Sequence, residues 1–179
     1  MTTARGAAAG PTPNLRRRLA AFVYEGVLLF GVLMMSALAY GLATQQRHAL
    51  VGMHGLQVFL FLVLGLYFCW FWSHGGQTVA MKTWHIRLLT KDGHPVPIAR
   101  AALRYVWSWL WFVPALLWSY AFGVRSGGAV ALALTLGVVV YAASSWLNPQ
   151  HQFWHDLLSG TRLVQIPPPR RRSSMETPA

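Results

Sequence analysis

The amino-acid sequence predicts an all-α membrane protein in which four transmembrane helices form two hairpins. The first observation is the length of the apolar segments at residues 19–43, 51–72, 103–122 and 129–147, since a helix crosses a bilayer with about 20 apolar residues. The second is that none of these segments alternates between apolar and polar residues, as a strand of a membrane barrel would. Helices are then the remaining structure that can span a membrane.

The third observation is the uneven distribution of basic residues, which number 15 against 4 acids. Only Arg47 and Arg125 lie in the short connections within the two hairpins, and the remaining basic residues precede, follow or separate the hairpins. Because basic residues accumulate on the cytoplasmic side of a membrane, we expect both termini in the cytoplasm. An even number of spans requires the same.

The chain ends differ in composition from the segment between them. Residues 1–14 are small, polar and proline-containing, and residues 166–179 contain three prolines followed by three arginines. These compositions predict flexible tails around a membrane domain at residues 15–165. The arginines of the C-terminal tail suit anionic lipid headgroups, at about 1 kcal/mol for each residue near the surface. The charge therefore gives no reason to expect nucleic acid as a partner.

The start of the chain imitates a secretory signal peptide, because three arginines precede an apolar run. That run is longer than the apolar region of a signal peptide, contains Glu25, and is followed by three further apolar segments. We therefore expect it to remain in the protein as the first span.

The connection between the hairpins, residues 73–100, mixes apolar and basic residues. This pattern predicts an amphipathic return segment at the cytoplasmic membrane surface, with an extended stretch at residues 86–90 before the turn signal Lys91-Asp92-Gly93. After the fourth span, residues 150–158 predict a second amphipathic helix at the same surface.

The two return segments share residues at a constant offset. Gln77 and Arg87-Leu88-Leu89 match Gln152 and Arg162-Leu163-Val164, 75 residues later. The chain is thus predicted to contain two copies of a unit with a basic entry, two spans and a return segment, an arrangement that occurs in transporters.

Two packing signals lie within the spans. Ala129, Ala133 and Gly137 give the fourth span one face of small residues for close helix contact. Pro114 removes a backbone donor from the third span and predicts a kink there.

Glu25 is the acid that lies inside an apolar segment. Arg18 precedes it by seven residues, roughly 10 Å along a helix, and Arg104 lies near the start of the third span. An unpaired carboxylate in a membrane is costly and is a functional candidate by default. Glu25 therefore either clamps helices together by pairing with Arg18 or Arg104, or handles an ion or proton.

Asp156 follows the fourth span, where it either pairs with Arg162 or completes a polar cluster with Glu25. His151 and His155 have a spacing of four residues, but a metal site needs a third ligand that the sequence does not place. We therefore expect no metal. The sequence contains no Walker loop, dinucleotide fingerprint or nucleophile elbow, so an enzyme and a cofactor are not expected either. Cys69 is the single cysteine and predicts no disulfide.

Four stretches of the sequence, "RRLAAFVYEGVLL", "GGQTVAMKTWHIRLL", "ARAALRYV" and "QHQFWHDLLSGTRLV", resemble the RDD family of bacterial membrane proteins. The family is named for an arginine at the start of the first span, an aspartate within that span, and a second aspartate. Arg18 fits the arginine and Asp156 the second aspartate. Glu25 stands where the first aspartate is expected, which keeps the charge and lengthens the side chain. The resemblance covers about residues 16–164 and implies the bacterial inner membrane, transport of unidentified ligands, and, from some members, cation/proton exchange.

Two functions from different classes follow. In the first, the protein is a small transporter or cation/proton exchanger that uses an intramembrane carboxylate, and it forms a homo-oligomer or binds a membrane partner because four helices enclose little volume. In the second, it is a scaffold or interaction protein that transports nothing and whose charged residues hold the bundle together. The main candidates for either role are Arg18, Glu25, Arg104 and Asp156, and the secondary candidates are Gln77, Arg87, His155 and Arg162.

Overall fold

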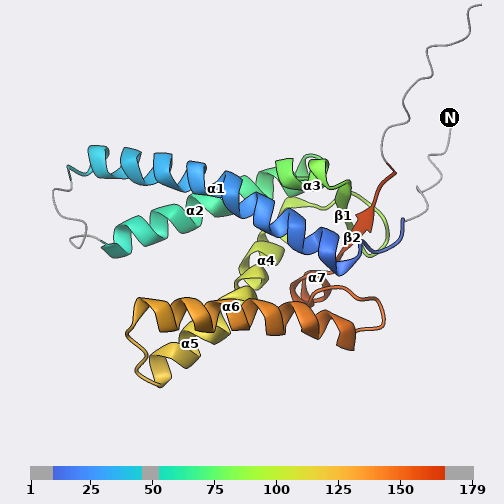
Figure 1. Ribbon diagram of the computed structural model, residues 1–179. Helices are drawn as coiled ribbons and strands as arrows, with labels where there is room; N and C mark the ends of the chain where they lie inside the picture. The colour runs from blue at the N-terminus through green and yellow to red at the C-terminus, as the bar shows by residue number, and fades with distance from the viewer. Residues whose placement is uncertain (1–9, 46–52, 168–179) are drawn as a thin grey trace, which may run out of the picture.

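The computed structural model of the protein describes residues 10–45 and 53–167, and most of them are helical. Figure 1 shows one long helical hairpin above a second, shorter one, with a helix running between them and a small sheet at the end where the described chain begins and finishes. The upper hairpin consists of α1 (Leu15–Ala43) and α2 (Met53–Ser73), the connecting helix is α4 (Ile98–Ser108), and the lower hairpin consists of α5 (Val113–Ala121) and α6 (Gly127–Ser144).

Within the described residues, three helical stretches are long and apolar enough to cross a membrane. They are Leu15–Ala43, Met53–Ser73 and Gly127–Leu147, the last including the 3-10 turn η2 (Ser145–Leu147). They correspond to the predicted first, second and fourth spans. The first begins four residues early because the side chain of Asn14 accepts a hydrogen bond from the backbone N–H of Arg17 at 2.9 Å and caps the helix. Residues 51 and 52 of the predicted second span, and Arg47, lie outside the described residues.

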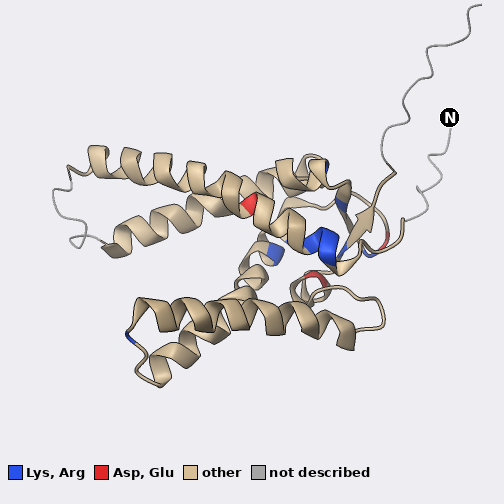
Figure 2. Cartoon of the chain, viewed as in Figure 1, with Lys and Arg blue, Asp and Glu red and all other residues tan. Residues whose placement is uncertain are grey.

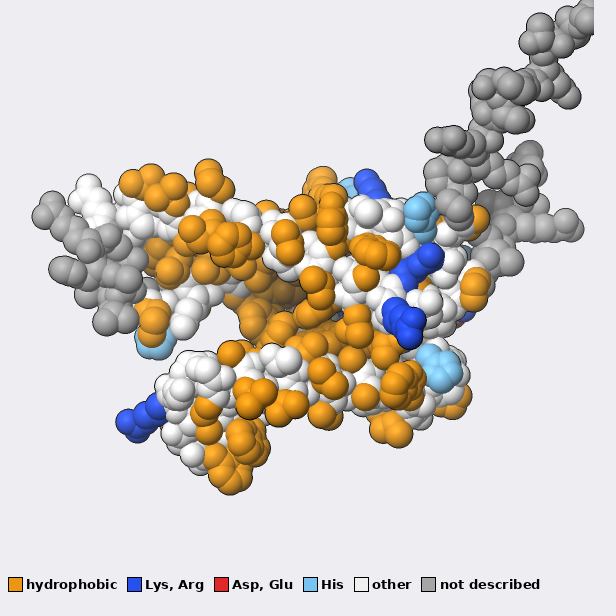
Figure 3. Space-filling view, in the orientation of Figure 1, with side chains coloured by type: hydrophobic (Ala, Val, Ile, Leu, Met, Phe, Trp, Pro, Cys, Tyr) orange, Lys and Arg blue, Asp and Glu red, His pale blue; other side chains and the backbone are white. Residues whose placement is uncertain are grey.

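Large apolar side chains remain exposed along all three long helices, among them Phe30, Leu66 and Val140. Figure 3 shows hydrophobic side chains over much of both hairpins. A continuous apolar surface of this extent is stable against lipid or another apolar partner but not against water. The length of these helices and their exposed apolar surface together indicate an integral membrane protein.

The predicted third span, residues 103–122, is not one continuous helix. It is divided into the end of α4, the 3-10 turn η1 (Trp109–Trp111) and α5. Phe112, with φ −122° and ψ −40°, leaves the helical region, and Pro114 lies in the first turn of the next helix. Proline is favoured there because the first N–H groups of a helix have no partner within it. Pro114 therefore starts a new helix instead of kinking an existing one.

The prediction of an all-α fold is wrong in one respect, because the return segments form a two-stranded antiparallel sheet. The strand β1 (Ile86–Thr90) follows the short helix α3 (Val79–Thr83), and β2 (Thr161–Gln165) follows α7 (Trp154–Leu158). The extended stretch predicted at residues 86–90 is confirmed. The helix predicted at 150–158 is shorter, since it begins only at Trp154.

The sheet register agrees with the sequence repeat at its central pair. Leu88 pairs with Leu163, 75 residues later, whereas the other matched residues do not face each other because the strands are antiparallel. The two matched glutamines have matching roles. Gln77 donates from Nε2 to the carbonyl of Ile86 at 2.7 Å, and Gln152 donates to the carbonyl of Leu163 at 3.1 Å. Each return segment is thus a short helix and a strand braced by a glutamine.

The last part of the predicted N-terminal tail, residues 10–14, contacts this sheet. The carbonyl of Pro11 accepts from the N–H of Gln165 at 2.9 Å, and Pro13 is fully buried. The segments 1–9 and 168–179 lie outside the described residues.

The small-residue face predicted on the fourth span lies partly against α5. A Cβ atom added to Gly137 of α6 would lie 2.8 Å from the Cβ of Ala115, closer than two carbon atoms normally approach. Gly137 therefore permits the close packing of α5 on α6.

Replacing Gly137 with valine is expected to destabilise the protein by about 1–3 kcal/mol, because the added atoms overpack this contact. The change would be measured as a shift in the unfolding transition of the detergent-solubilised protein. Gly31→Val is the matched control, since an added Cβ at Gly31 meets nothing within 4 Å. Equal effects of the two substitutions would show that the contact between α5 and α6 is not tight.

Candidate functional site

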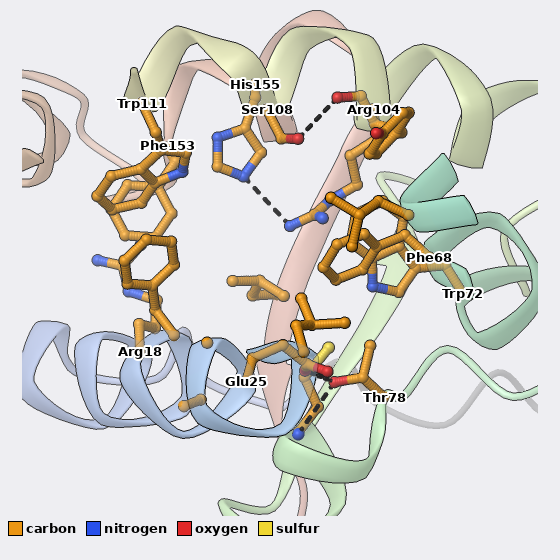
Figure 4. Close-up of a pocket in the computed structure, with 18 of the residues that line it drawn as sticks. Arg18, Glu25, Phe68, Trp72, Thr78, Arg104, Ser108, Trp111, Phe153 and His155 are labelled. Atoms are coloured by element: carbon orange, nitrogen blue, oxygen red, sulfur yellow. Dashed lines mark hydrogen bonds between the residues drawn. The ribbon is translucent and has the colours of Figure 1, made fainter. Parts of the chain in front are cut away.

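A cavity of about 350 Å³ is lined by residues of α1, α2, α3, α4, the turn η1, α7 and both strands of the sheet. Figure 4 shows its charged and polar groups at the rim, with aromatic side chains between them. The charged or titratable side chains that line it are Arg18 and Glu25 of α1, Arg104 and Tyr105 of α4 and His155 of α7. In Figure 2 the charged residues of α1, α4 and α7 lie toward the sheet, and the distal halves of α1 and α2 carry none.

Glu25 is buried, with 8% of its surface exposed, and both of its carboxylate oxygens accept hydrogen bonds from hydroxyl groups. The Tyr67 hydroxyl on α2 donates to Oε1 at 2.6 Å, and the Thr78 hydroxyl donates to Oε2. Thr78 is also the N-cap of α3, where its Oγ1 accepts from the N–H of Met81 at 3.3 Å. The carboxylate therefore joins α1, α2 and α3.

Neither of the expected arginine partners of Glu25 forms an ion pair with it within the described residues. Arg104 pairs instead with Asp156, with Nη2 at 2.8 Å and Nε at 2.9 Å from the same Oδ1 oxygen. The exposed fractions are 6% for Arg104 and 0% for Asp156. The expected alternative for Asp156, a pair with Arg162, is absent from the described part of the chain. The guanidinium of Arg104 also lies over the ring of Trp72, 4.1 Å from its centroid.

His155 extends this ion pair into a buried network. Its Nε2 is 3.2 Å from Nη2 of Arg104, and its Nδ1 is 2.9 Å from the hydroxyl of Tyr141. An arginine can only donate, so Nε2 is the acceptor and Nδ1 carries the proton. The pKa of His155 is lowered to about 4, chiefly because the side chain is buried; Asp156 raises it in part, and Arg104 and Arg18 lower it. His155 is therefore neutral at pH 7.

Arg18 lies at the other side of the cavity and is 5% exposed. Its guanidinium carbon is 4.2 Å from the centroid of the Phe153 ring. Its Nε and Nη1 atoms are buried and have no hydrogen-bond partner within residues 10–45 and 53–167. Arg18 thus differs from Arg104, whose charge is matched by a carboxylate in direct contact.

The other secondary candidates do not reach the cavity. Gln77 braces β1, as described above. Arg87 is exposed on β1, and Arg162 is on β2, where its Nε is buried without a partner among the described residues. Tyr67, Thr78 and Tyr141, whose hydroxyl groups complete the two networks, were not among the predicted site residues. A signal was available for Tyr67 and Tyr141, since each is a hydroxyl-bearing residue inside a predicted apolar span.

The two spaced histidines do not share a helix. His151 precedes α7 and has a positive φ of 52°, whereas His155 lies within it. No group of three or more His, Cys, Asp or Glu side chains in the described chain is arranged to hold a metal ion.

Comparison with known proteins identifies the family of the chain. Residues 12–160 match the model of the RDD family. No curated protein and no solved structure gives a match. The matched range includes α1 to α7 with Arg18, Glu25, Arg104 and Asp156. The chain therefore belongs to the RDD family and is an integral membrane protein.

Proposed function

We propose that this protein is a small transporter of the bacterial inner membrane that exchanges a cation for a proton at Glu25. The observation that carries the proposal is the position of this carboxylate, which is buried, faces a cavity, and contacts two hydroxyl groups from other elements. A titratable acid within a membrane segment has a functional role more often than an acid on a soluble surface does.

The oxygen atoms around Glu25 suit this chemistry. Carboxylate and hydroxyl oxygens are hard ligands of the kind that hard cations prefer. Tyr67 and Thr78 donate to the free carboxylate, and the same two hydroxyls can rotate to offer lone pairs to a cation. A proton and a cation would compete for the same carboxylate oxygens, so binding of one favours release of the other. This competition is the minimum requirement for exchange.

The proposal includes an orientation and a partner. Both termini lie in the cytoplasm, since the basic residues gather at the end of the molecule that carries the sheet. Anionic headgroups contact this basic end. A second copy of the chain completes the enclosure of the pathway, because α5, with nine residues, extends only about 14 Å at 1.5 Å per residue and cannot cross a bilayer alone.

Glu25→Gln is expected to abolish exchange while the protein stays folded, because glutamine retains the shape but cannot gain and lose a proton near pH 7. The measurement is pH-gradient-driven cation flux in liposomes that contain the purified protein, followed with an internal pH dye for Na⁺, K⁺ and Li⁺ in turn. Asp92→Asn is the matched control, because Asp92 is an exposed acid that does not line the cavity. Equal flux in wild type and Glu25→Gln would exclude exchange at this residue.

The alternative is a scaffold that transports nothing, and the same contacts support it because Glu25 ties α1 to α2 and α3. A scaffold predicts no flux in either protein. It also predicts that Glu25→Gln lowers the stability of the solubilised protein, since one hydroxyl loses its acceptor at an expected cost of about 1–3 kcal/mol. Flux and stability measured on the same preparations therefore separate the two functions.

A further inference from the structure

We propose that the cavity binds an amphiphilic anion, a carboxylate or phosphate group on an apolar body, and that Arg18 is the residue that binds its charged end. This inference goes beyond cation/proton exchange and does not depend on titration of Glu25.

Arg18 has hydrogen-bonding capacity that no described residue meets. The side chain is 95% buried, lines the cavity, and leaves Nε and Nη1 without an acceptor among the described residues. A buried charge without a partner is costly, so proteins generally supply a counter-charge. Guanidinium groups favour carboxylate and phosphate, which can accept two parallel hydrogen bonds from them.

The guanidinium of Arg18 is also held in position by an aromatic ring. It stacks on the ring of Phe153, and Figure 4 shows it extending from α1 toward Phe153 and Trp111 at one edge of the cavity. Stacking on an aromatic face satisfies the face of the guanidinium and leaves its edge, with the N–H groups, free to bind an anion.

Neither carboxylate near the cavity contacts Arg18. Asp156 accepts from Arg104 through Oδ1, its Oδ2 is buried without a partner among the described residues, and it forms no ion pair with Arg18 within 4.0 Å. Glu25 accepts from Tyr67 and Thr78. The formal charges of the two arginines and the two acids at this site sum to zero, but the direct contacts leave Arg18 without an acceptor. Because Glu25 repels an anion, the charged end of the ligand is placed at Arg18 and its apolar body along the rest of the cavity.

The rest of the cavity lining suits the apolar part of the ligand. Most of these residues are aromatic or aliphatic, and they include Phe22, Leu64, Phe68, Trp72, Trp109 and Phe112. The volume of about 350 Å³ is in the lower range of ligand pockets. At about 30 Å³ for each water-sized group it accommodates about twelve non-hydrogen atoms, the size of decanoate. Figure 3 shows a hollow lined with hydrophobic side chains between the two hairpins, through which an amphiphile could enter from the bilayer.

Bromodecanoate is a suitable probe, because bromine quenches tryptophan fluorescence on contact and Trp72, Trp109 and Trp111 line the cavity. The protein is titrated in a nonionic detergent with bromodecanoate and, separately, with bromodecanol, which lacks the charge. Wild type is expected to bind the acid about 10- to 100-fold more tightly than the alcohol, the range expected for a charge-assisted hydrogen bond.

Arg18→Gln is expected to remove this preference and weaken binding of the acid by the same factor. Arg16→Gln is the matched control, because Arg16 is an exposed arginine on the same turn of α1, and it should bind like wild type. Gly26→Leu retains Arg18 and is the second variant. Gly26 lines the cavity, and an added Cβ there meets nothing within 4 Å. The variant should therefore fold normally, and its leucine side chain should occupy the space of the ligand.

The source of the ligand is tested by competition. If the occupant is a membrane lipid, phosphatidylglycerol added to the detergent displaces bromodecanoate from wild type and phosphatidylcholine does not. If it is a free acid, neither lipid displaces it. Both outcomes support an anion site at Arg18. Equal quenching by acid and alcohol, or equal binding by wild type, Arg18→Gln and Gly26→Leu, would overturn the proposal. Loss of flux in Glu25→Gln has no bearing on this result, so the two proposals fail independently.

Discussion

Replacing Asp156 with alanine is expected to destabilise the protein by about 3–5 kcal/mol, because it leaves the buried guanidinium of Arg104 without its counter-ion. The carboxylate is completely buried and contacts two nitrogen atoms of Arg104 through one oxygen. It joins α4 to α7, two elements separated by about fifty residues in the sequence, so its loss should loosen the whole sheet end of the molecule. The measurement is the shift in the unfolding transition of the solubilised protein, followed by tryptophan fluorescence, since Trp72 stacks on Arg104.

A double substitution distinguishes loss of the pair from loss of the carboxylate alone. When both members of a buried ion pair are replaced by apolar residues of similar size, stability is often recovered. We therefore expect Arg104→Met combined with Asp156→Leu to be more stable than Asp156→Ala. Asp92→Ala, at an exposed acid, should change stability by less than about 0.5 kcal/mol. A small effect of Asp156→Ala, similar to that of Asp92→Ala, would show that water reaches Arg104.

The parts of the fold that the sequence predicted are those governed by local composition. The helices α1, α2 and α6 consist of long apolar runs, and they lie close to the predicted spans because hydropathy locates such runs. The strand at residues 86–90 was predicted because a turn signal follows it at Lys91-Asp92-Gly93.

The prediction of a continuous third span was wrong for a physical reason that a single sequence does not reveal. A proline within an apolar run can kink a helix or begin a new one, and the choice depends on what packs around it. Here α4 carries Arg104 toward Asp156 and therefore belongs to the polar end of the molecule, whereas α5 packs on α6. The two halves of the run have different partners, and the chain changes direction between them at residues 109–112.

Residue type and position predicted Arg18, Glu25, Arg104 and Asp156 as site residues, and the structure brings them to the half of the molecule that carries the sheet. The pairing could not be inferred, because it depends on how distant helices pack. Glu25 is hydrogen-bonded by hydroxyl groups 42 and 53 residues away, and Arg104 is joined to an acid 52 residues away. Tyrosine and threonine are common in all environments, so Tyr67 and Thr78 gave little signal on their own.

The second large effect is a loss of stability as the pH falls, and it is expected to arise from His155. Its pKa of about 4 in the folded protein is lower than the value of about 6.5 for an exposed histidine. Above pH 6.5 the side chain is neutral in both the folded and the unfolded protein, and the stability is complete. Between pH 6.5 and 4 the unfolded chain binds a proton that the folded one does not, so the free energy of unfolding falls as the pH falls. The loss approaches about 3 kcal/mol at pH 4.

This prediction follows from the groups that face the imidazole. Arg104 donates to Nε2 and would have to give up that hydrogen bond if the nitrogen were protonated, and Arg18 adds a second positive charge. Asp156, 3.5 Å from Nε2, is already paired with Arg104 and compensates only in part. Replacing His155 with glutamine, which cannot gain a charge, should flatten the dependence of stability on pH between 6.5 and 4. Replacing His94, an exposed histidine, with glutamine should leave the wild-type profile unchanged. If the His155→Gln profile matched that of wild type, another group would be responsible for the acid sensitivity, and His155 would not be held neutral by the arginines beside it.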